Sequence, residues 1–289
     1  MVDKKSLETF LTLAKEQSFS RTAEKLNITQ PAISKRISNL EQELNTQLID
    51  RIGKQATLTH SGKILEQHAL RLLTGMQDCK NAINNTHTEI DGELNLGVSH
   101  HIGLHRLPPY LKAFSQQYPK VQLNMQFVDS EQAYQLINSG ELELALATLA
   151  PKKDKHIHQQ NIWNDPLCFM VSKDHTLCQK DSINLETLLS EPAILPSTNT
   201  YTGKLIKDIF EQQHLIIESD IETNYLETIR MMVSIGLGWT VLPNTMLNEQ
   251  LHPLSINDTQ LNRELGYILH EKRTLSNAAK AFLVTITKK

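Results

Sequence analysis

The sequence is poor in cysteine and contains no long apolar run. Its three cysteines, Cys79, Cys168 and Cys178, form no CxxC pair and no disulfide framework, so we expect reduced thiols. No stretch approaches the roughly 18 consecutive apolar residues that a membrane span needs, and the first residues lack the apolar core of a secretion signal. Together these absences argue against contact with a membrane and predict a cytoplasmic protein.

Motifs of the common enzyme classes are also missing. The sequence has no Gly-rich phosphate loop, no GxSxG and no HExxH, so we expect neither catalytic activity nor a cofactor. Two sensing alternatives stay open. His100, His101 and His105 could hold a metal ion, but no fourth ligand is evident, and we expect no resident metal. Cys168 and Cys178 could form a redox switch, although a strand is expected at the first of them.

Charge is distributed unevenly along the 289 residues. Residues 1–90 contain 12 Lys and Arg against 10 Asp and Glu, a net charge of +2, whereas residues 91–289 contain 17 against 22, a net charge of −5. At roughly 100–200 residues per domain, this length predicts two or three domains. A mildly basic head on an acidic body is typical of a nucleic-acid-binding module joined to a part that does not touch nucleic acid.

The first sixty residues have the pattern of short helices followed by a hairpin. Apolar residues at i, i+3, i+4 and i+7 predict one face of a first helix: Leu7, Phe10, Leu11 and Ala14. Ser20 is a suitable N-cap for a second helix over residues 21–26. A tight turn at residues 27–29 leads to a third helix, which Thr29 can cap and whose first turn holds Pro31.

The third helix has two different faces. Its buried stripe is expected to consist of Ile33, Ile37, Leu40 and Leu44. The opposite face carries Gln30, Ser34, Lys35, Ser38 and Asn39. Such a face suits the DNA major groove, because its side chains donate and accept hydrogen bonds and do not repel phosphate. An ordinary solvated helix face is the plain alternative.

A small hairpin follows the third helix and has basic residues beside its tip, at Arg51 and Lys54. Two short helices at a turn, followed by a basic hairpin or wing, form a DNA-binding arrangement. The candidate DNA contacts are Arg21, Thr29, Gln30, Pro31, Ser34, Lys35, Ser38, Arg51 and Lys54.

These residues resemble the N-terminal signature of the LysR-type transcriptional regulators, densely and collinearly over about sixty positions. The resemblance rests on Phe10–Ala14, Ser18-Phe19-Ser20, Ala23-Glu24-Lys25-Leu26, Thr29-Gln30-Pro31-Ala32-Ile33-Ser34, Ile37-Ser38-Asn39-Leu40-Glu41, Leu58-Thr59 and Gly62. It implies that the residues at 30, 31, 34 and 35 lie against the groove and that those at 51 and 54 belong to the wing. The expected domain covers residues 1–60.

Residues 61–90 are expected to form a linker helix that pairs with a second copy. An a/d seam steps by 4 and 3 residues along it: Leu65, Ala69, Leu72, Met76, Cys79 and Ile83. A narrow seam favours a twin helix over packing on a core, which is the alternative. The family resemblance implies the same pairing. A twofold dimer implies a roughly palindromic DNA site, and we expect such dimers to pair into a homotetramer.

Residues 91–289 alternate strand-like and helical runs, which predicts parallel sheets covered by helices. Strands are expected at 94–99, 121–128, 142–148, 167–172, 193–195, 216–222, 239–242 and 265–269, and helices at 108–117, 131–138, 203–213, 225–235 and 276–286. Two lobes follow from this pattern. Lobe I is expected over residues 92–163 and 265–289, and lobe II over residues 164–264.

Ligands of such sheets bind at the carboxyl ends of strands, beside helix N-termini. The polar residues found there are Ser99, His100, His101, Ser130, Thr148, Ser197, Thr200, Tyr201, Thr202 and Asn224. We expect no acid close to them except Glu222. Neutral donors of this kind suit a small anion or a polar carboxylate, although Ser, Thr and Asn at helix starts are often only caps.

The body also resembles the LysR-type effector domain, a two-lobed fold similar to periplasmic binding proteins. The resemblance rests on Tyr118-Pro119, Gly140–Ala145 and Gly236–Pro243, and Thr200–Gly203 is similar to the anion-holding turn of regulators of sulfur assimilation. The adjacent histidines at 100 and 101 depart from the family pattern and leave the ligand class open. A transport-type solute-binding protein is disfavoured by the winged head.

The whole sequence therefore predicts a winged helix-turn-helix domain, a linker helix and an α/β two-lobed effector domain. The function expected is a promoter-binding transcriptional regulator controlled by a small effector, such as a small anion or a sulfur metabolite, held between the lobes. RNA polymerase is a further candidate partner. The metal and redox alternatives above would make it a regulator of the same family with a different signal.

Overall fold

The computed structural model describes residues 2–52, 55–87, 89–257 and 259–288. The chain divides into two compact units, Met1–Thr86 with Ser139–Glu141 and His87–Asn138 with Leu142–Lys289. Among the described residues, no helix combines the length and the apolar character needed to cross a bilayer.

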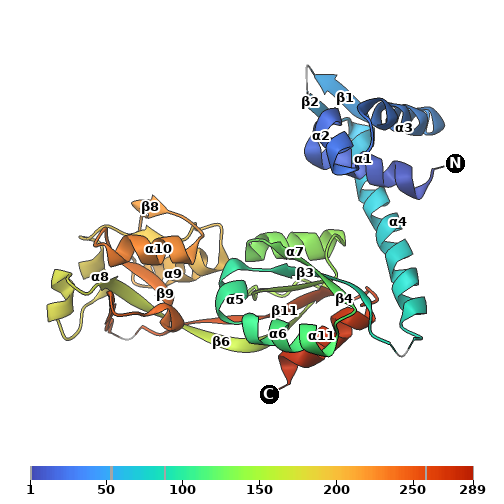
Figure 1. Ribbon diagram of the computed structural model, residues 1–289. Helices are drawn as coiled ribbons and strands as arrows, with labels where there is room; N and C mark the ends of the chain where they lie inside the picture. Colours follow the sequence, from blue (N-terminus) through green and yellow to red (C-terminus); the bar gives the residue numbers. More distant parts are fainter. Residues whose placement is uncertain (1, 53–54, 88, 258, 289) are drawn as a thin grey trace. The chain divides into compact units, whose positions relative to one another are not determined.

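The first unit begins with three helices, α1 (Lys4–Glu16), α2 (Phe19–Lys25) and α3 (Gln30–Glu43), shown in blue in Figure 1. The prediction that Ser20 caps the second helix is wrong, because Ser18 is its N-cap. The Ser18 hydroxyl accepts a hydrogen bond from the Arg21 amide at 3.4 Å, which sets the start of α2 two residues earlier.

The turn and the core of this unit follow the sequence pattern closely. Asn27, in the turn between α2 and α3, has a φ of 52°, a left-handed conformation that asparagine tolerates well. Phe10, Leu13, Ile33 and Ile37 are buried in one apolar core. Leu44, predicted in the buried stripe, is instead 38% exposed, because it is the C-cap at which α3 ends.

A hairpin and a long helix complete the first unit. Strands β1 (Ile49–Ile52) and β2 (Gln55–Leu58) pair antiparallel, as the predicted wing requires. Helix α4 (His60–Asn84) then runs for 25 residues. The hydroxyl of its N-cap, Thr59, accepts a hydrogen bond from the Gly62 amide at 3.0 Å, which fixes the start of the helix.

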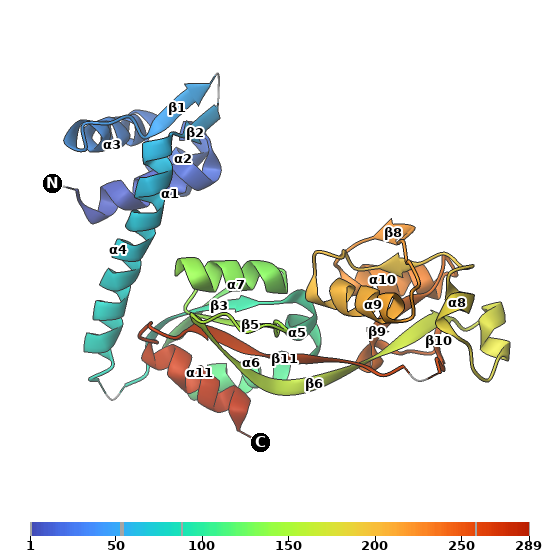
Figure 2. The ribbon, with the colours of Figure 1, turned by 180° about the vertical axis from the view of Figure 1, so that it is seen from behind.

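The main sheet of the second unit is mixed. Strands β3 (Gly92–Val98), β4 (Val121–Phe127) and β5 (Leu144–Thr148) are parallel, but β6 (Ile157–Ser172), β9 (Thr240–Pro243), β10 (Leu251–Leu254) and β11 (Leu261–His270) pair antiparallel, in the order β10-β6-β11-β5-β3-β4 with β9 beside β6. The prediction of purely parallel sheets is therefore wrong. Two long strands, β6 and β11, run in opposite directions and reach from one lobe into the other, as both ribbon views show (Figures 1 and 2).

In lobe I, helices cover both faces of the sheet. Helices α6 (Pro108–Gln117) and α11 (Asn277–Thr287) lie on one face and α7 (Ser130–Ser139) on the other (Figure 2). Phe114 of α6 and Phe282 of α11 meet edge to face in the core between them, with 5.2 Å between their ring centres. A short helix that the sequence did not predict, α5 (His100–His105), follows β3 directly.

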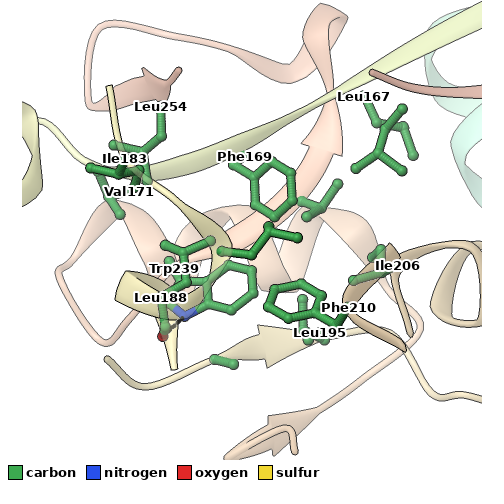
Figure 3. Packing of buried hydrophobic residues seen from close by; sticks show 14 of the residues in the cluster. Leu167, Phe169, Val171, Ile183, Leu188, Leu195, Ile206, Phe210, Trp239 and Leu254 are labelled. Carbon is green, nitrogen blue, oxygen red and sulfur yellow. Dashed lines mark hydrogen bonds between the residues drawn. The ribbon is translucent and has the colours of Figure 1, made fainter. Parts of the chain in front are cut away.

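Lobe II contains η1 (Thr176–Gln179), α8 (Leu185–Leu188), β7 (Ile194–Leu195), α9 (Tyr201–Gln212), β8 (Ile221–Glu222), α10 (Leu226–Ser234) and η2 (Asn244–Met246). The predicted strand over residues 216–222 forms only at its last two residues. Trp239 lies at the centre of the lobe's core beside Phe169 and Phe210, and its indole N–H donates to the Leu188 carbonyl at 3.0 Å (Figure 3).

The two lobes have separate apolar cores, and the strands β6 and β11 pass from one core to the other. Along β6 the core of lobe I includes Trp163 and that of lobe II includes Leu167, and along β11 the change falls between Leu265 and Leu261. Asp165 and Arg263 lie opposite each other in the register of these strands. The crossing point between the lobes therefore carries charged side chains where the two apolar cores end.

Candidate functional site

The outward face of α3 presents the side chains that the sequence proposed for DNA. Thr29, Gln30, Pro31, Lys35 and Ser38 are exposed. Thr29 is the N-cap, but its side chain makes no capping hydrogen bond. The Gln30 amide oxygen accepts from the Ser20 hydroxyl at 3.3 Å, which holds the first side chain of α3 against α2. Ser34, in the same helix, is half-buried.

Two arginines of the head, one on α2 and one on the wing, are fixed by neighbouring groups. The Arg21 guanidinium donates to the Glu16 carbonyl at 2.7 Å, across the turn between α1 and α2. The Arg51 guanidinium of the wing lies 4.6 Å from the centre of the Phe19 ring, a cation–π arrangement that attaches the hairpin to the start of α2. Lys54, the other predicted wing contact, lies outside the described residues.

The predicted seam on α4 is only partly covered within one chain. Leu72, Met76 and Ile83 are 57%, 52% and 61% exposed, and Cys79 is also exposed. Ala69 is fully buried where α4 packs against α1, and Leu65 contacts the core of the head. The first two seam positions therefore help to hold the head on α4, while the other four form an uncovered apolar row.

Eight of the ten predicted effector residues line one cavity between lobe I and lobe II: Ser99, His100, His101, Ser130, Thr148, Thr200, Thr202 and Asn224. They come from the ends of β3 and β5, from the starts of α5, α7 and α9, and from the loop before α10. A Cβ at Gly203 would lie 2.1 Å from the Ser197 carbonyl oxygen, so only glycine allows the start of α9 to approach the loop before it so closely.

The other two predicted residues do not line the cavity. The Ser197 backbone amide donates to the Asn224 side chain at 3.1 Å, and its hydroxyl accepts from the Asn199 amide at 3.2 Å. The Tyr201 ring packs edge to face on Tyr134 of lobe I, with 5.7 Å between their ring centres. Both residues serve the shape of the cleft rather than its lining.

The cavity also contains residues that the sequence interpretation missed, among them Asp129, Glu131 and Arg263. The expectation that Glu222 would be the only nearby acid is wrong, since it does not line the cavity and the two other acids do. Both acids flank Ser130 directly after β4, so the strand-end rule could have found them. Arg263 could not be found in this way, because it comes from the middle of an antiparallel strand far along the chain.

Polar contacts connect the two lobes around the cavity. The Glu131 carboxylate of lobe I accepts a hydrogen bond from the Tyr201 amide, the first N–H of α9, at 2.5 Å. The Asp129 carboxylate accepts from the Asn224 amide group at 3.2 Å. The Nε2 atom of His105, on α5, lies 2.5 Å from a carboxylate oxygen of Glu227, on α10. Each contact would have to change if the lobes moved apart.

A buried charge cluster lies behind the cavity at the crossing of β6 and β11. Asp165 is fully buried; its carboxylate accepts from Arg263 Nε at 2.7 Å and from Arg106 at 3.0 Å. Arg263 also donates to the Thr202 hydroxyl at 3.0 Å. Burial opposes ionisation of Asp165, but His101 and Arg263 stabilise its anion and hold its pKa far below the usual range. The carboxylate therefore stays charged at any physiological pH.

His101 adds a titratable group to this cluster. It is 8% exposed, and its Nε2 lies 3.7 Å from an Asp165 oxygen. Burial lowers the pKa of His101, and the nearby Asp165 opposes this shift only in part. The imidazole is consequently neutral at pH 7, so Asp165 is balanced by the two arginines rather than by the histidine.

The metal and redox alternatives gain little support from the described part of the chain. No group of three or more His, Cys, Asp or Glu residues there is arranged to hold a metal ion. Burial raises the pKa of Cys168 to about 11 and also raises the pKa of Cys178. Thiols with raised pKa values are poor nucleophiles at neutral pH, which disfavours a redox switch at these positions.

Comparisons with known proteins agree with this architecture. Two family models match the chain, a bacterial regulatory helix-turn-helix protein of the lysR family over residues 5–63 and a LysR substrate binding domain over residues 87–289. The transcriptional regulator CysL of Bacillus subtilis is 26% identical over 287 residues, which cover 98% of this chain and 95% of CysL.

Solved structures show the same fold. A full-length OxyR variant from Pseudomonas aeruginosa has a TM-score of 0.72 at 21% identity, covering 99% of this chain and 94% of that one. Full-length CbnR complexed with its target DNA has a TM-score of 0.67 at 16% identity, covering 99% of both chains. The architecture is an N-terminal winged helix-turn-helix domain followed by a two-lobed α/β effector-binding domain.

Proposed function

Because the chain belongs to the LysR family of bacterial transcriptional regulators, we propose that it binds a roughly palindromic promoter site as a homodimer and responds to a small effector between its lobes. In this proposal α3 reads base edges in the major groove, with Gln30 and Lys35 as its main contacts, and the wing contacts phosphate through Arg51 and Lys54. The observation that carries the DNA part is the exposed polar face of α3, in a head whose wing arginine, Arg51, is held against Phe19 of α2.

The uncovered apolar row on α4 supports dimerisation. Four seam positions at heptad spacing are exposed in a single chain, and exposed apolar rows of this spacing pair with a second helix in coiled coils. The paired helices would give the dimer a twofold axis, and two heads related by that axis require two inverted half-sites. We propose that two dimers pair into a tetramer on longer promoter sites.

The effector part of the proposal rests on the cavity between the lobes. Eight polar residues chosen from strand ends and helix starts line it together, as in α/β folds that bind ligands at the carboxyl ends of strands. The effector is a small polar molecule with an anionic group; sulfate, sulfite and thiosulfate are the first anions to test. Binding acts on transcription only if the two lobe arrangements differ in affinity for the effector.

Selection of DNA sites tests the proposed function directly. Full-length protein would be used to select binding sites from a random DNA pool, and the selected sites would then be bound at several salt concentrations. We expect an inverted repeat, bound by one dimer or a pair of dimers. Selection of no sequence, with binding that depends only on salt, would contradict the assignment of α3 to base recognition.

A further inference from the structure

The charge cluster behind the cavity has an excess of positive charge. Asp165 contributes one negative charge, whereas Arg106 and Arg263 both contact it and contribute two positive ones. Arg263 is 8% exposed and lines the cavity, and its Nη2 atom is buried without a hydrogen-bond partner in the described part of the chain. Leaving a buried guanidinium N–H unpaired costs free energy, and the cavity that the Arg263 side chain lines is where an anionic group of a ligand could approach this guanidinium.

Hydroxyl groups complete an anion subsite beside Arg263. The Thr202 oxygen accepts from Arg263, so its own hydrogen stays available to a ligand. The Ser99 and Thr148 side chains line the same cavity, and neither hydroxyl takes part in a hydrogen bond with the chain as described. One guanidinium edge and several hydroxyl donors match the needs of a carboxylate.

The remaining charge of the cavity has the opposite sign. Asp129 and Glu131 also line it, and their hydrogen-bond partners are neutral, the Asn224 amide and the Tyr201 N–H. Among the described residues, neither carboxylate has a salt-bridge partner. An ionised carboxylate can accept about four hydrogen bonds, so both acids keep acceptor capacity for a cationic donor from a ligand.

We propose that the effector of this cleft is a small zwitterion, with its carboxylate at Arg263 and its ammonium group at Asp129 and Glu131; α-amino acids are the simplest members of this class. This inference rests on the proposed effector function of the same cleft. A simple anion would satisfy Arg263 but face two acids of like charge. A simple amine would satisfy the acids and leave the excess positive charge of Arg106 and Arg263 without an anion.

Matched ligands test the two charges separately. Thermal unfolding and calorimetric titration of the full-length protein would use as probes the twenty L-α-amino acids, O-acetyl-L-serine, the corresponding 2-hydroxy acids, and sulfate, sulfite and thiosulfate. Each amino acid that binds would be compared with its 2-hydroxy acid, which lacks the ammonium group, and its decarboxylated amine, which lacks the carboxylate. We expect at least one zwitterion to bind the protein. Both of its partial analogues should bind at least about tenfold more weakly, because each analogue leaves a desolvated charge of the cavity unpaired.

Isosteric variants then assign the ammonium subsite. Asp129→Asn and Glu131→Gln remove the charges but keep oxygen acceptors for the Asn224 amide and the Tyr201 N–H, so the contacts between lobes persist. Each should weaken binding of the amino acid by about tenfold or more while leaving the 2-hydroxy acid unchanged or bound more tightly. Glu211→Gln on α9 is the control, since that glutamate is exposed, pairs with Lys207 and does not line the cavity.

Three outcomes would overturn the inference in different ways. Binding of 2-hydroxy acids or sulfur oxyanions that Thr202→Ala abolishes, with no amino acid bound, would leave an anion-responsive regulator and contradict the zwitterion. Equal binding of the amino acid to wild type, to Asp129→Asn and to Glu131→Gln would show that neither acid takes part in recognition. Absence of binding by every probe, with operator binding intact, would contradict the zwitterion and the small-anion effector together and leave only the DNA-binding part of the proposed function.

Discussion

At the scale of single residues, α3 and the wing should have separable effects on DNA. Gln30 is exposed at the first turn of α3, where an amide can pair with an adenine edge. Gln30→Ala should cost about 1–3 kcal/mol at the selected site and relax sequence choice, with little effect on random DNA. Titration of labelled duplexes, specific and random, measures both. Unchanged affinity of Gln30→Ala for the selected site would show that α3 lies in another register on the groove.

Arg51 should behave differently, because its proposed contact is a phosphate. Arg51→Ala should weaken binding to specific and random DNA by similar factors and reduce the slope of log affinity against log salt by about one charge. Arg51→Lys keeps the charge but loses the flat guanidinium over Phe19. If the lysine variant fails as badly as alanine, the cation–π attachment of the wing matters more than the phosphate contact.

The residue scale also shows where sequence reasoning about the site succeeded and where it failed. Ser99, Ser130, Thr148 and Thr200 could be chosen because each follows a strand or starts a helix, and backbone geometry alone brings such positions to one edge. Arg263 has no such local signal. It reaches the cavity because β11 crosses between the lobes antiparallel to β6, which depends on long-range pairing.

At the scale of elements, the sequence predicted helices and strands that bury one face, but it did not predict the direction in which strands pair. The stripe of α3 and the wing hairpin were readable because burial imposes a period of 3.6 or 2. Whether a strand pairs parallel or antiparallel leaves no comparable trace. The first ten residues of β6, 157–166, also escaped detection, because they are rich in polar side chains and end at Pro166, a residue that usually argues against a strand.

The exposed row on α4 leads to a prediction at this scale. Met76→Glu places a charge in the proposed dimer seam and should raise the dimer dissociation constant by at least about tenfold, since burying one such side chain contributes about 1.5–3 kcal/mol. Analytical ultracentrifugation measures the change. Gln67→Glu, at an exposed position of α4 outside the seam, is the matched control. Equal dissociation of both variants would show that α4 does not pair through this row.

At the scale of the whole effector domain, two separate cores meet at a polar crossing. Each lobe has its own buried aromatic centre, whereas the strands that join the lobes carry Asp165 and Arg263 at the point of change. Apolar residues there would fuse the cores into one packed body. Here the crossing holds a buried ion pair instead, and one member of the pair, Arg263, also lines the cleft. A ligand that contacts Arg263 can thereby act on the relative arrangement of the lobes.

The same cluster makes the stability of the domain depend on pH through His101. Three charged or titratable groups lie beside it, Asp165, Arg263 and His105, and Arg106 contacts the same Asp165 carboxylate. Burial lowers its pKa in the folded protein, whereas an unfolded histidine titrates near about 6.5. Below that pH His101 binds a proton in the unfolded chain but not in the folded protein, where its pKa is lower. The free energy of unfolding should therefore fall as pH decreases from about 7 to about 5, and be fully restored above about 7.

Urea unfolding followed by tryptophan fluorescence measures this dependence, because both tryptophans, Trp163 and Trp239, lie in the effector domain. The loss of stability between pH 7.5 and pH 5 should be smaller in His101→Gln than in wild type, since glutamine keeps a polar group beside Asp165 but cannot titrate there. His214→Gln, at an exposed position of lobe II, should retain the wild-type loss. A His101→Gln variant with the full wild-type pH dependence would place the responsible proton elsewhere and show that the imidazole is not held neutral at the crossing of the lobes.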